Sequence, residues 1–266
     1  MMRNILTACT AALLLLTSHA FAAPKSDLWP IWNSSDESNA ASIDHARWQQ
    51  ILDKYLVEKG QHTLFDYSGV NNADKALLSQ YLTDMASLDP RSYNKNEQFA
   101  YWVNLYNALT VKLILDEYPI QSITKLGGFL SFGPWDDNIT QVAGQSLTLN
   151  DIEHRILRPI WNDARIHYAV NCASLGCPNL SKTAFSADNS EALLEEAAKQ
   201  FTNSDKGARI DGDTLTLSSI YEWYGVDFGH NEQAILKAID QYREGDRLHG
   251  WRGKINYDYD WSLNQP

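Results

Sequence analysis

Cysteine and long apolar runs are both scarce in this chain. It has three cysteines in 266 residues, and the first of them, Cys9, lies near the N-terminus. The apolar run at residues 5–16 is too short for a comfortable membrane span, and no later segment approaches the roughly 18 apolar residues that a membrane-crossing helix needs. We therefore expect no stable membrane insertion.

Basic charge and nucleotide-binding motifs are lacking as well. Lysine and arginine total 22 against 33 acidic residues, which gives a formal net charge of −11. Such an acidic surface repels phosphate backbones, so we expect no nucleic-acid partner. The chain has neither the Gly-Lys-Ser/Thr ending of a phosphate-binding loop nor the Gly-x-Ser-x-Gly elbow of a serine hydrolase. We expect no cofactor.

The N-terminus has the pattern of an export signal. Arg3 precedes the apolar run, and Ala20-Phe21-Ala22 is the small-residue pattern at which signal peptides are cleaved. The mature protein would be periplasmic or secreted, in a compartment where disulfides persist. The expected division of the chain is a signal peptide at 1–22, a linker at 23–41 and one domain at 42–266.

Hydrophobic periodicity predicts a single compact α+β domain. The helix 97–118 is apolar nearly all round, so it would lie at the centre of the domain and pack on a small antiparallel sheet. That sheet would consist of two hairpins, at 142–152 and 210–220, and a strand at 165–171. Further helices are expected at 43–55, 72–86, 151–158, 189–203, 218–225 and 231–243.

Two amides interrupt the apolar surface of the central helix. Asn104 and Asn107 are three residues apart, so they share one face. A buried amide left without a partner costs about 1–3 kcal/mol, so each needs hydrogen bonds. Either the two amides bind neighbouring backbone, or they face a cleft and orient a substrate or a catalytic imidazole.

Two histidines and an acid precede the last two cysteines. Glu153 stands where a capping-box acid belongs, three residues after the expected N-cap, and His154 follows it. In a strand at 165–171, His167 and Asn171 would share one face. His154 could turn toward this face, which would bring the two imidazoles together.

Five motifs of the chain, in the same order, resemble the family catalogued as domain of unknown function 547. Ile-His-Tyr-Ala-Val-Asn-Cys-Ala-Ser-Leu-Gly-Cys-Pro, starting at Ile166, is the longest. The motifs cover residues 101–110, 149–154, 166–178, 223–228 and 257–264. The chain departs from the family at Asn179, where a second proline is usual. The resemblance implies a domain found alone in exported bacterial proteins and fused to other modules elsewhere, and it implies no activity.

Cys172 and Cys177 admit three interpretations. In an exported protein they would close a structural disulfide, which stabilises by roughly 2 kcal/mol. Alternatively, Cys172 is a nucleophile with His167 or His154 as its base. The residues that could orient this base are Glu153, Asn104, Asn107 and Asn171. In the third interpretation the two thiols join the two imidazoles in a tetrahedral zinc site made of His154, His167, Cys172 and Cys177.

The favoured function is a thiol-dependent hydrolase or acyl transferase that acts on an amide or ester of the cell envelope. The alternatives are a non-catalytic binding module stapled by the disulfide, and a zinc-binding domain. The expected partner is a small molecule or peptide of the envelope. Nine tryptophans and 13 tyrosines indicate an aromatic-rich core, or a groove lined by rings for sugars or peptides.

The export signal gives the first testable prediction. Protein recovered from the periplasm or the medium should begin at Ala23, because cleavage follows the small-residue pattern, and should carry no acyl chain. Intact mass spectrometry and N-terminal sequencing measure both properties. A lipid-modified Cys9 would contradict the prediction and place the protein on a membrane.

Overall fold

A computed structural model describes residues 24–128 and 132–266 of the chain. The predicted signal peptide at 1–22 lies outside these ranges, so the export signal stays a prediction. The longer helices are α1 (Ala46–Tyr55), α2 (Asn72–Ser87), α3 (Lys95–Glu117), α6 (Ser190–Thr202) and α9 (Glu232–Asp240). The shorter ones are the π-helix η5 (Asp151–Leu157), α4 (Arg158–Trp161), α5 (Ile166–Ala169), α7 (Ile220–Trp223) and α8 (Gly225–Phe228). Single 3-10 turns cover Pro30–Trp32, Tyr67–Gly69, Pro90–Ser92 and Ile123–Lys125.

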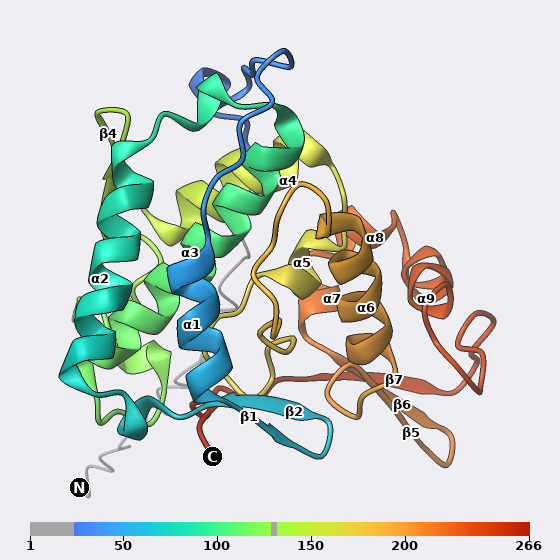
Figure 1. Ribbon diagram of the computed structural model, residues 1–266. Coiled ribbons are helices and arrows are strands. Elements are labelled where there is room, and N and C mark those ends of the chain that lie inside the picture. Colours follow the sequence, from blue (N-terminus) through green and yellow to red (C-terminus); the bar gives the residue numbers. More distant parts are fainter. Residues whose placement is uncertain (1–23, 129–131) are drawn as a thin grey trace, which may run out of the picture.

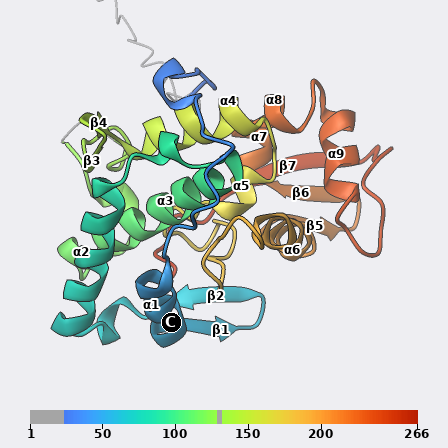
Figure 2. The same cartoon turned by 45° about the horizontal axis from the view of Figure 1, so that its top comes forward.

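Seven short strands complete the fold of the described residues. They are β1 (Leu56–Lys59), β2 (His62–Phe65), β3 (Thr140–Val142), β4 (Gln145–Leu147), β5 (Ala208–Asp211), β6 (Thr214–Ser218) and β7 (Lys254–Asp258). The predicted α+β class is therefore confirmed. Two groups of elements lie side by side: α1, α2 and α3 on one side, and α6 to α9 with β5, β6 and β7 on the other (Figures 1 and 2). Each group surrounds a hydrophobic core of its own.

The helix α3 is the centre of the larger core, as its all-round apolar surface predicts. Its first turn is capped by Asn94, whose side chain accepts from the N–H groups of Asn96 and Glu97. The helix is buried along most of its length, and it packs against α2 and η5. The predicted packing of this helix on a single sheet is wrong, because the neighbours that cover it are helices.

The predicted sheet is also divided differently. The pairs β1–β2 and β3–β4 are separate antiparallel hairpins, and β7 joins β6 in parallel to form the sheet β5–β6–β7. Instead of a strand at 165–171, the chain forms the single turn α5, and Val170 is the first extended residue. The Asp163 carboxylate accepts from the Arg165 N–H at 2.8 Å and so favours a helical turn. This local bonding outweighs the apolar alternation.

The segment at 24–41, predicted as a linker, packs on the domain. Trp32 is 1% exposed and its ring lies edge-on to Trp102 with centroids 5.1 Å apart. Ahead of it, the N–H groups of Asp27 and Trp29 donate to carbonyls of η5. In the part of the chain that the structure describes, none of the helices combines the length and the hydropathy needed to cross a bilayer.

The C-terminal segment after β7 connects the two groups of elements. Figure 1 shows β7 running from the smaller group toward the C-terminus, which lies beside the β1–β2 hairpin. The Phe65 N–H donates to the Asn264 carbonyl at 2.8 Å, and the N–H groups of Leu175 and Gly176 donate to Ser262 and Asp260. This segment therefore lines the loop that carries both cysteines.

Candidate functional site

The structure separates the predicted site residues into three places. Glu153, His154 and His167 meet in an ionic cluster. Cys172 and Cys177 lie together in a thiol cluster. Asn104 and Asn107 brace the backbone. The ionic cluster also contains Arg158 and Asp227, and the thiol cluster contains Ser174 and Tyr259.

The helix that supplies the ionic cluster begins with a capping box, but not with the predicted one. Thr148 Oγ1 accepts from the Asp151 N–H, and the Asp151 carboxylate accepts from the Thr148 N–H, both at 3.0 Å. The expected capping role of Glu153 is therefore wrong, and its side chain is buried. The helix then widens into η5, in which the Arg158 N–H donates to the Glu153 carbonyl. Such π-turns are frequent at functional sites.

His167 lies between two carboxylates. Its Nε2 is 2.7 Å from Asp227 Oδ2, and its Nδ1 is 3.4 Å from Glu153 Oε1. Burial lowers the pKa of this imidazole, but the hydrogen bonds to Asp227 and Glu153 outweigh burial and raise it above the usual value. The Tyr224 ring stacks on the imidazole at 4.3 Å. The two flanking carboxylates therefore favour the imidazolium form of His167.

Arg158 completes the ionic cluster. Its Nε donates to Asp227 Oδ2 at 2.6 Å, and one terminal nitrogen donates to Pro24 O at 2.8 Å and to His154 Nδ1 at 3.0 Å. Burial, together with this guanidinium, lowers the pKa of His154 to about 4. His154 is therefore neutral near pH 7 and accepts from Arg158.

The two carboxylates balance the two cations. Burial favours the protonated form of Glu153, but His154, His167 and Arg158 outweigh it and lower the pKa to about 2. The pKa of Asp227 is also well below its usual range, because hydrogen bonds from His167 and Arg158 outweigh burial. The cluster is thus a closed, satisfied network, with Asp227 as its most accessible member at 21% side-chain exposure.

Asn104 and Asn107 do not face a cleft. Asn107 donates to the Ala169 carbonyl at 3.0 Å and accepts from the Asn171 N–H at 2.8 Å. Asn104 makes the same pair of bonds with the backbone of Phe185. Both amides are almost fully buried. Their predicted role as orienting groups of a catalytic imidazole is wrong, and the alternative of binding neighbouring backbone is confirmed.

The thiol cluster forms where the chain turns sharply after Asn171. The Asn171 side chain donates to Pro178 O at 2.7 Å and accepts from the Ala173 N–H at 2.8 Å. Ala173 has a left-handed backbone with φ of 58°, which costs an alanine about 1 kcal/mol or more. Strain of this kind persists where the surrounding bonds enforce it, and it gathers at functional sites.

Both thiols are free and lie against each other. Cys177 Sγ accepts from the Cys172 N–H at 2.8 Å, while Cys172 Sγ lies 3.0 Å from Tyr259 Oη and 3.2 Å from Ser174 Oγ. Burial raises the pKa of Cys172. Burial acts in the same direction on Cys177, but hydrogen bonds from Cys172 and Tyr259 outweigh it and lower that pKa. The predicted disulfide stays a prediction, as does the nucleophile.

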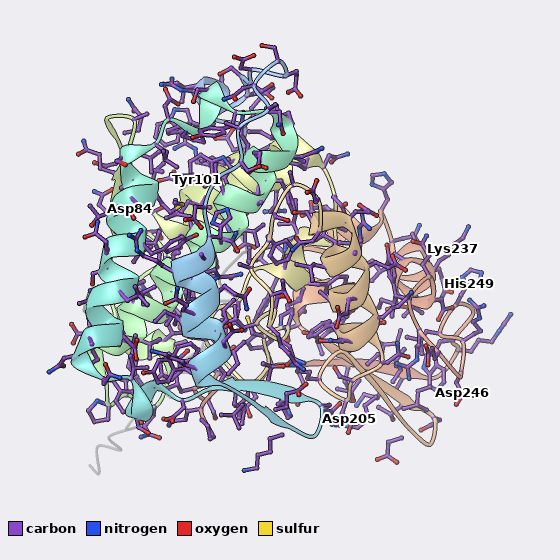
Figure 3. All side chains as sticks on the ribbon, in the orientation of Figure 1. Asp84, Tyr101, Asp205, Lys237, Asp246 and His249 are labelled. Atoms are coloured by element: carbon purple, nitrogen blue, oxygen red, sulfur yellow. The ribbon has the colours of Figure 1, made fainter. Side chains whose placement is uncertain are left out.

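A polar cleft of about 270 Å³ adjoins the thiol cluster. It is lined by Tyr259 and Gly176, by the tip of the β1–β2 hairpin and by the α6–β5 loop. Figure 3 shows Asp205 beside that hairpin, and its N–H donates to Gln61 Oε1 at 2.7 Å. Lys206 reaches from this loop to the Cys177 carbonyl at 2.6 Å, and burial lowers its pKa to about 8.

The predicted zinc ligands do not converge. The imidazoles belong to the ionic cluster and the thiols to the thiol cluster. Within residues 24–128 and 132–266, no group of three or more His, Cys, Asp or Glu side chains is arranged to hold a metal ion.

The comparison with protein families agrees with the motifs. Residues 90–202 match the model of a family described as "Protein of unknown function, DUF547". The resemblance to DUF547 is confirmed for this segment. The DUF547 match contains His167 and both cysteines, whereas Asp227 and Tyr259 follow it. No curated protein and no solved structure matches the chain.

Sequence reasoning missed the residues that complete each cluster, although a signal was present. Asp227 and Tyr224 lie in the motif at 223–228, and Tyr259 lies in the motif at 257–264. Both motifs resemble the family, yet no local pattern connects them with the cysteines. Arg158 follows His154 by one helical turn, a spacing that brings side chains together.

The brace formed by Asn107 gives a second prediction. Asn107→Leu should lower the free energy of unfolding by about 3 kcal/mol, because it leaves a buried carbonyl and a buried N–H unpaired. Urea unfolding measures the loss. Asn96→Leu, at an exposed position of the same helix, is the matched control and should change little. A stability of Asn107→Leu equal to that of the control would contradict the structural role.

The ionic cluster gives a third prediction, which concerns pH. The folded pKa of His167 is raised, so its contribution to stability is fully present below about pH 6.5 and is lost as the pH rises through the folded pKa. Asp227→Asn should cost on the order of 3 kcal/mol near pH 6, and less at higher pH. Urea unfolding from about pH 5 to about pH 9 measures the difference.

The matched control for this prediction is Glu222→Gln, which removes an exposed carboxylate from the preceding helix. Its effect should be small at every pH, because exposed charges contribute little. A cost of Asp227→Asn that does not change with pH would show that His167 is not the imidazolium partner of this carboxylate.

Proposed function

We propose that this protein is an exported thiol enzyme of the cell envelope, and that its reacting group is the pair Cys172 and Cys177. The observation that carries the proposal is the 2.8 Å hydrogen bond from the Cys172 N–H to Cys177 Sγ, which holds the Cys177 sulfur against the backbone of Cys172. Thiol–disulfide exchange needs an attacking sulfur and a resolving sulfur within reach of each other. We therefore propose exchange as the reaction.

Cys177 supplies the base that sequence reasoning assigned to an imidazole. When the pair holds one proton, the charge rests on Cys177, and the Cys172 thiol donates to it. Movement of that proton to Cys177 leaves a thiolate on Cys172, which is the more exposed of the two residues. His167 is paired with the carboxylates of Glu153 and Asp227. Because its two ring nitrogens face these partners, we assign the role of base for Cys172 to Cys177 and not to an imidazole.

Atoms and electrons balance in the proposed exchange. The Cys172 thiolate attacks a disulfide R–S–S–R′, a bond forms between Cys172 Sγ and the R-bearing sulfur, and R′S⁻ leaves and takes the proton from Cys177. The Cys177 thiolate then attacks Cys172 Sγ, and RS⁻ leaves and takes a proton from water. The cysteine pair loses two electrons and the substrate disulfide gains them.

The predicted hydrolase or acyl transferase would begin from the same Cys172 thiolate, which would attack a carbonyl instead of a sulfur. Exchange is favoured because only that reaction uses the second sulfur as a resolving group. The adjoining cleft supports a small substrate, held by hydrogen bonds.

Thiol trapping and rapid kinetics test this proposal, which is our fourth prediction. In dithiothreitol buffers of graded potential, the folded protein should pass through one two-electron transition between dithiol and disulfide. Cys177→Ser should slow the attack of Cys172 on an aromatic disulfide by about tenfold or more near pH 7, because the base is lost. Ser174→Ala removes only a hydroxyl beside Cys172 and serves as the matched control.

Two other results would contradict exchange. If Cys172 attacks the aromatic disulfide as fast in Cys177→Ser as in the wild type, and more slowly in His167→Ala, an imidazole is the base, as in the predicted acyl transferase. If the pair is oxidised and cannot be reduced without unfolding, the disulfide-stapled binding module stands. Melting curves of each variant separate loss of reactivity from loss of fold.

A further inference from the structure

Five partly exposed rings form a continuous patch beside the thiol cluster, which we call the aromatic row. They come from the turn before β3, from α7 and from the segment after β7: Phe132, Trp135, Trp223, Tyr259 and Trp261. Trp261 lies at the centre, with its centroid 4.6 Å from Tyr259 and 5.6 Å from both Trp135 and Trp223. Contiguous exposed apolar surface of this kind marks interaction sites.

The aromatic row is fixed in place by the backbone beneath it. Gly133 has a φ of 91°, and a Cβ at this position would collide with the Trp135 ring, so the ring packs directly against its own turn. The Trp135 carbonyl accepts from the Asn150 N–H at 3.0 Å. Backbone hydrogen bonds join the segment with Tyr259 and Trp261 to the loop that carries Cys172 and Cys177, which we call the thiol loop. A ligand would therefore meet a preformed surface and would not have to order it.

The aromatic row continues into the polar cleft through Tyr259. The cleft residues beside this ring carry carboxylates, amines and amides, which both accept and donate hydrogen bonds: Asp258, Asp260, Lys206, Arg209 and Gln61. The complete surface is thus a cluster of rings, which pack edge-to-face or tilted on one another around Trp261, next to a cleft that carries charged side chains. A bound peptide would be better matched by apolar pockets for its side chains.

We infer that the aromatic row and the cleft bind a saccharide chain that bears no acidic groups. A sugar ring has apolar C–H faces, which stack on tryptophan and tyrosine, and a rim of hydroxyls, which pair with carboxylates and amines. The net charge of −11 and the three aspartates in the cleft disfavour anionic ligands. This site does not depend on the proposed thiol exchange.

Tryptophan fluorescence and calorimetry with defined oligosaccharides test the inference, our fifth prediction. The probes are tetrasaccharides of N-acetylglucosamine, of β-linked glucose and of α-linked glucose, with a tetrapeptide of alanine and lysine for comparison. At least one saccharide should bind and shift the emission. Trp261→Ala and Trp223→Ala should each raise Kd by about tenfold or more. Trp251→Ala, at a half-buried tryptophan outside the aromatic row, is the matched control and should leave Kd unchanged.

Trp261→Tyr keeps a ring at the centre of the row and is used if Trp261→Ala fails to fold; it should weaken binding less than Trp223→Ala. Cys172→Ser should bind the saccharide as the wild type does, so failure of the thiol proposal would not remove this one. Binding of the tetrapeptide alone, equal affinity in Trp223→Ala and wild type, or no binding of any saccharide at about 10 mM would overturn the inference.

Discussion

One carboxylate that serves two buried cations holds the candidate site together. Asp227, at α8 in the smaller core, accepts from Arg158 at 2.6 Å and from His167 at 2.7 Å. Removing such charges from water costs several kcal/mol per ion unless each is paired and hydrogen-bonded. Separation of the two cores would break both pairs, so the ionic cluster fixes the position of α8 relative to α4 and α5. The thiol loop begins directly after α5 and inherits that position.

Amide side chains carry this fixed position into the thiol loop. Asn107 holds the backbone on both sides of Val170, and Asn171 closes the turn that contains Ala173. The left-handed backbone at Ala173 persists because these bonds, together with the paired C-terminal segment, enforce it. As a result the two sulfurs meet although the loop between them is strained. A buried ionic network and several amide side chains thus position the two thiols.

Local patterns predicted most helices and the adjacency of the cysteines, because both depend on residues close in sequence. The all-round apolar surface identified α3, and the apolar stripe at 72–86 identified α2. The alternation of apolar residues at 165–171 wrongly predicted a strand, because the hydrogen bond from the Arg165 N–H to the Asp163 carboxylate favours a helical turn. The completing residues are distant in sequence: Asp227 lies 60 positions after His167, and Tyr259 lies 87 after Cys172. No local period reports contacts of that range, and an apolar helix does not reveal whether its amides face backbone or a cleft.

The central claim is that Cys177 holds the negative charge of the thiol pair and acts as base for Cys172. Titration of the two cysteines by ¹³C nuclear magnetic resonance, with the Cβ carbons labelled, tests it most directly, because each thiol reports its own ionisation. The account predicts that Cys177 ionises below the usual range near pH 8.5 and Cys172 above it, and that Cys172→Ala raises the pKa of Cys177 by removing the donor thiol. Ionisation of Cys172 before Cys177, or of both at the ordinary value, would contradict the account.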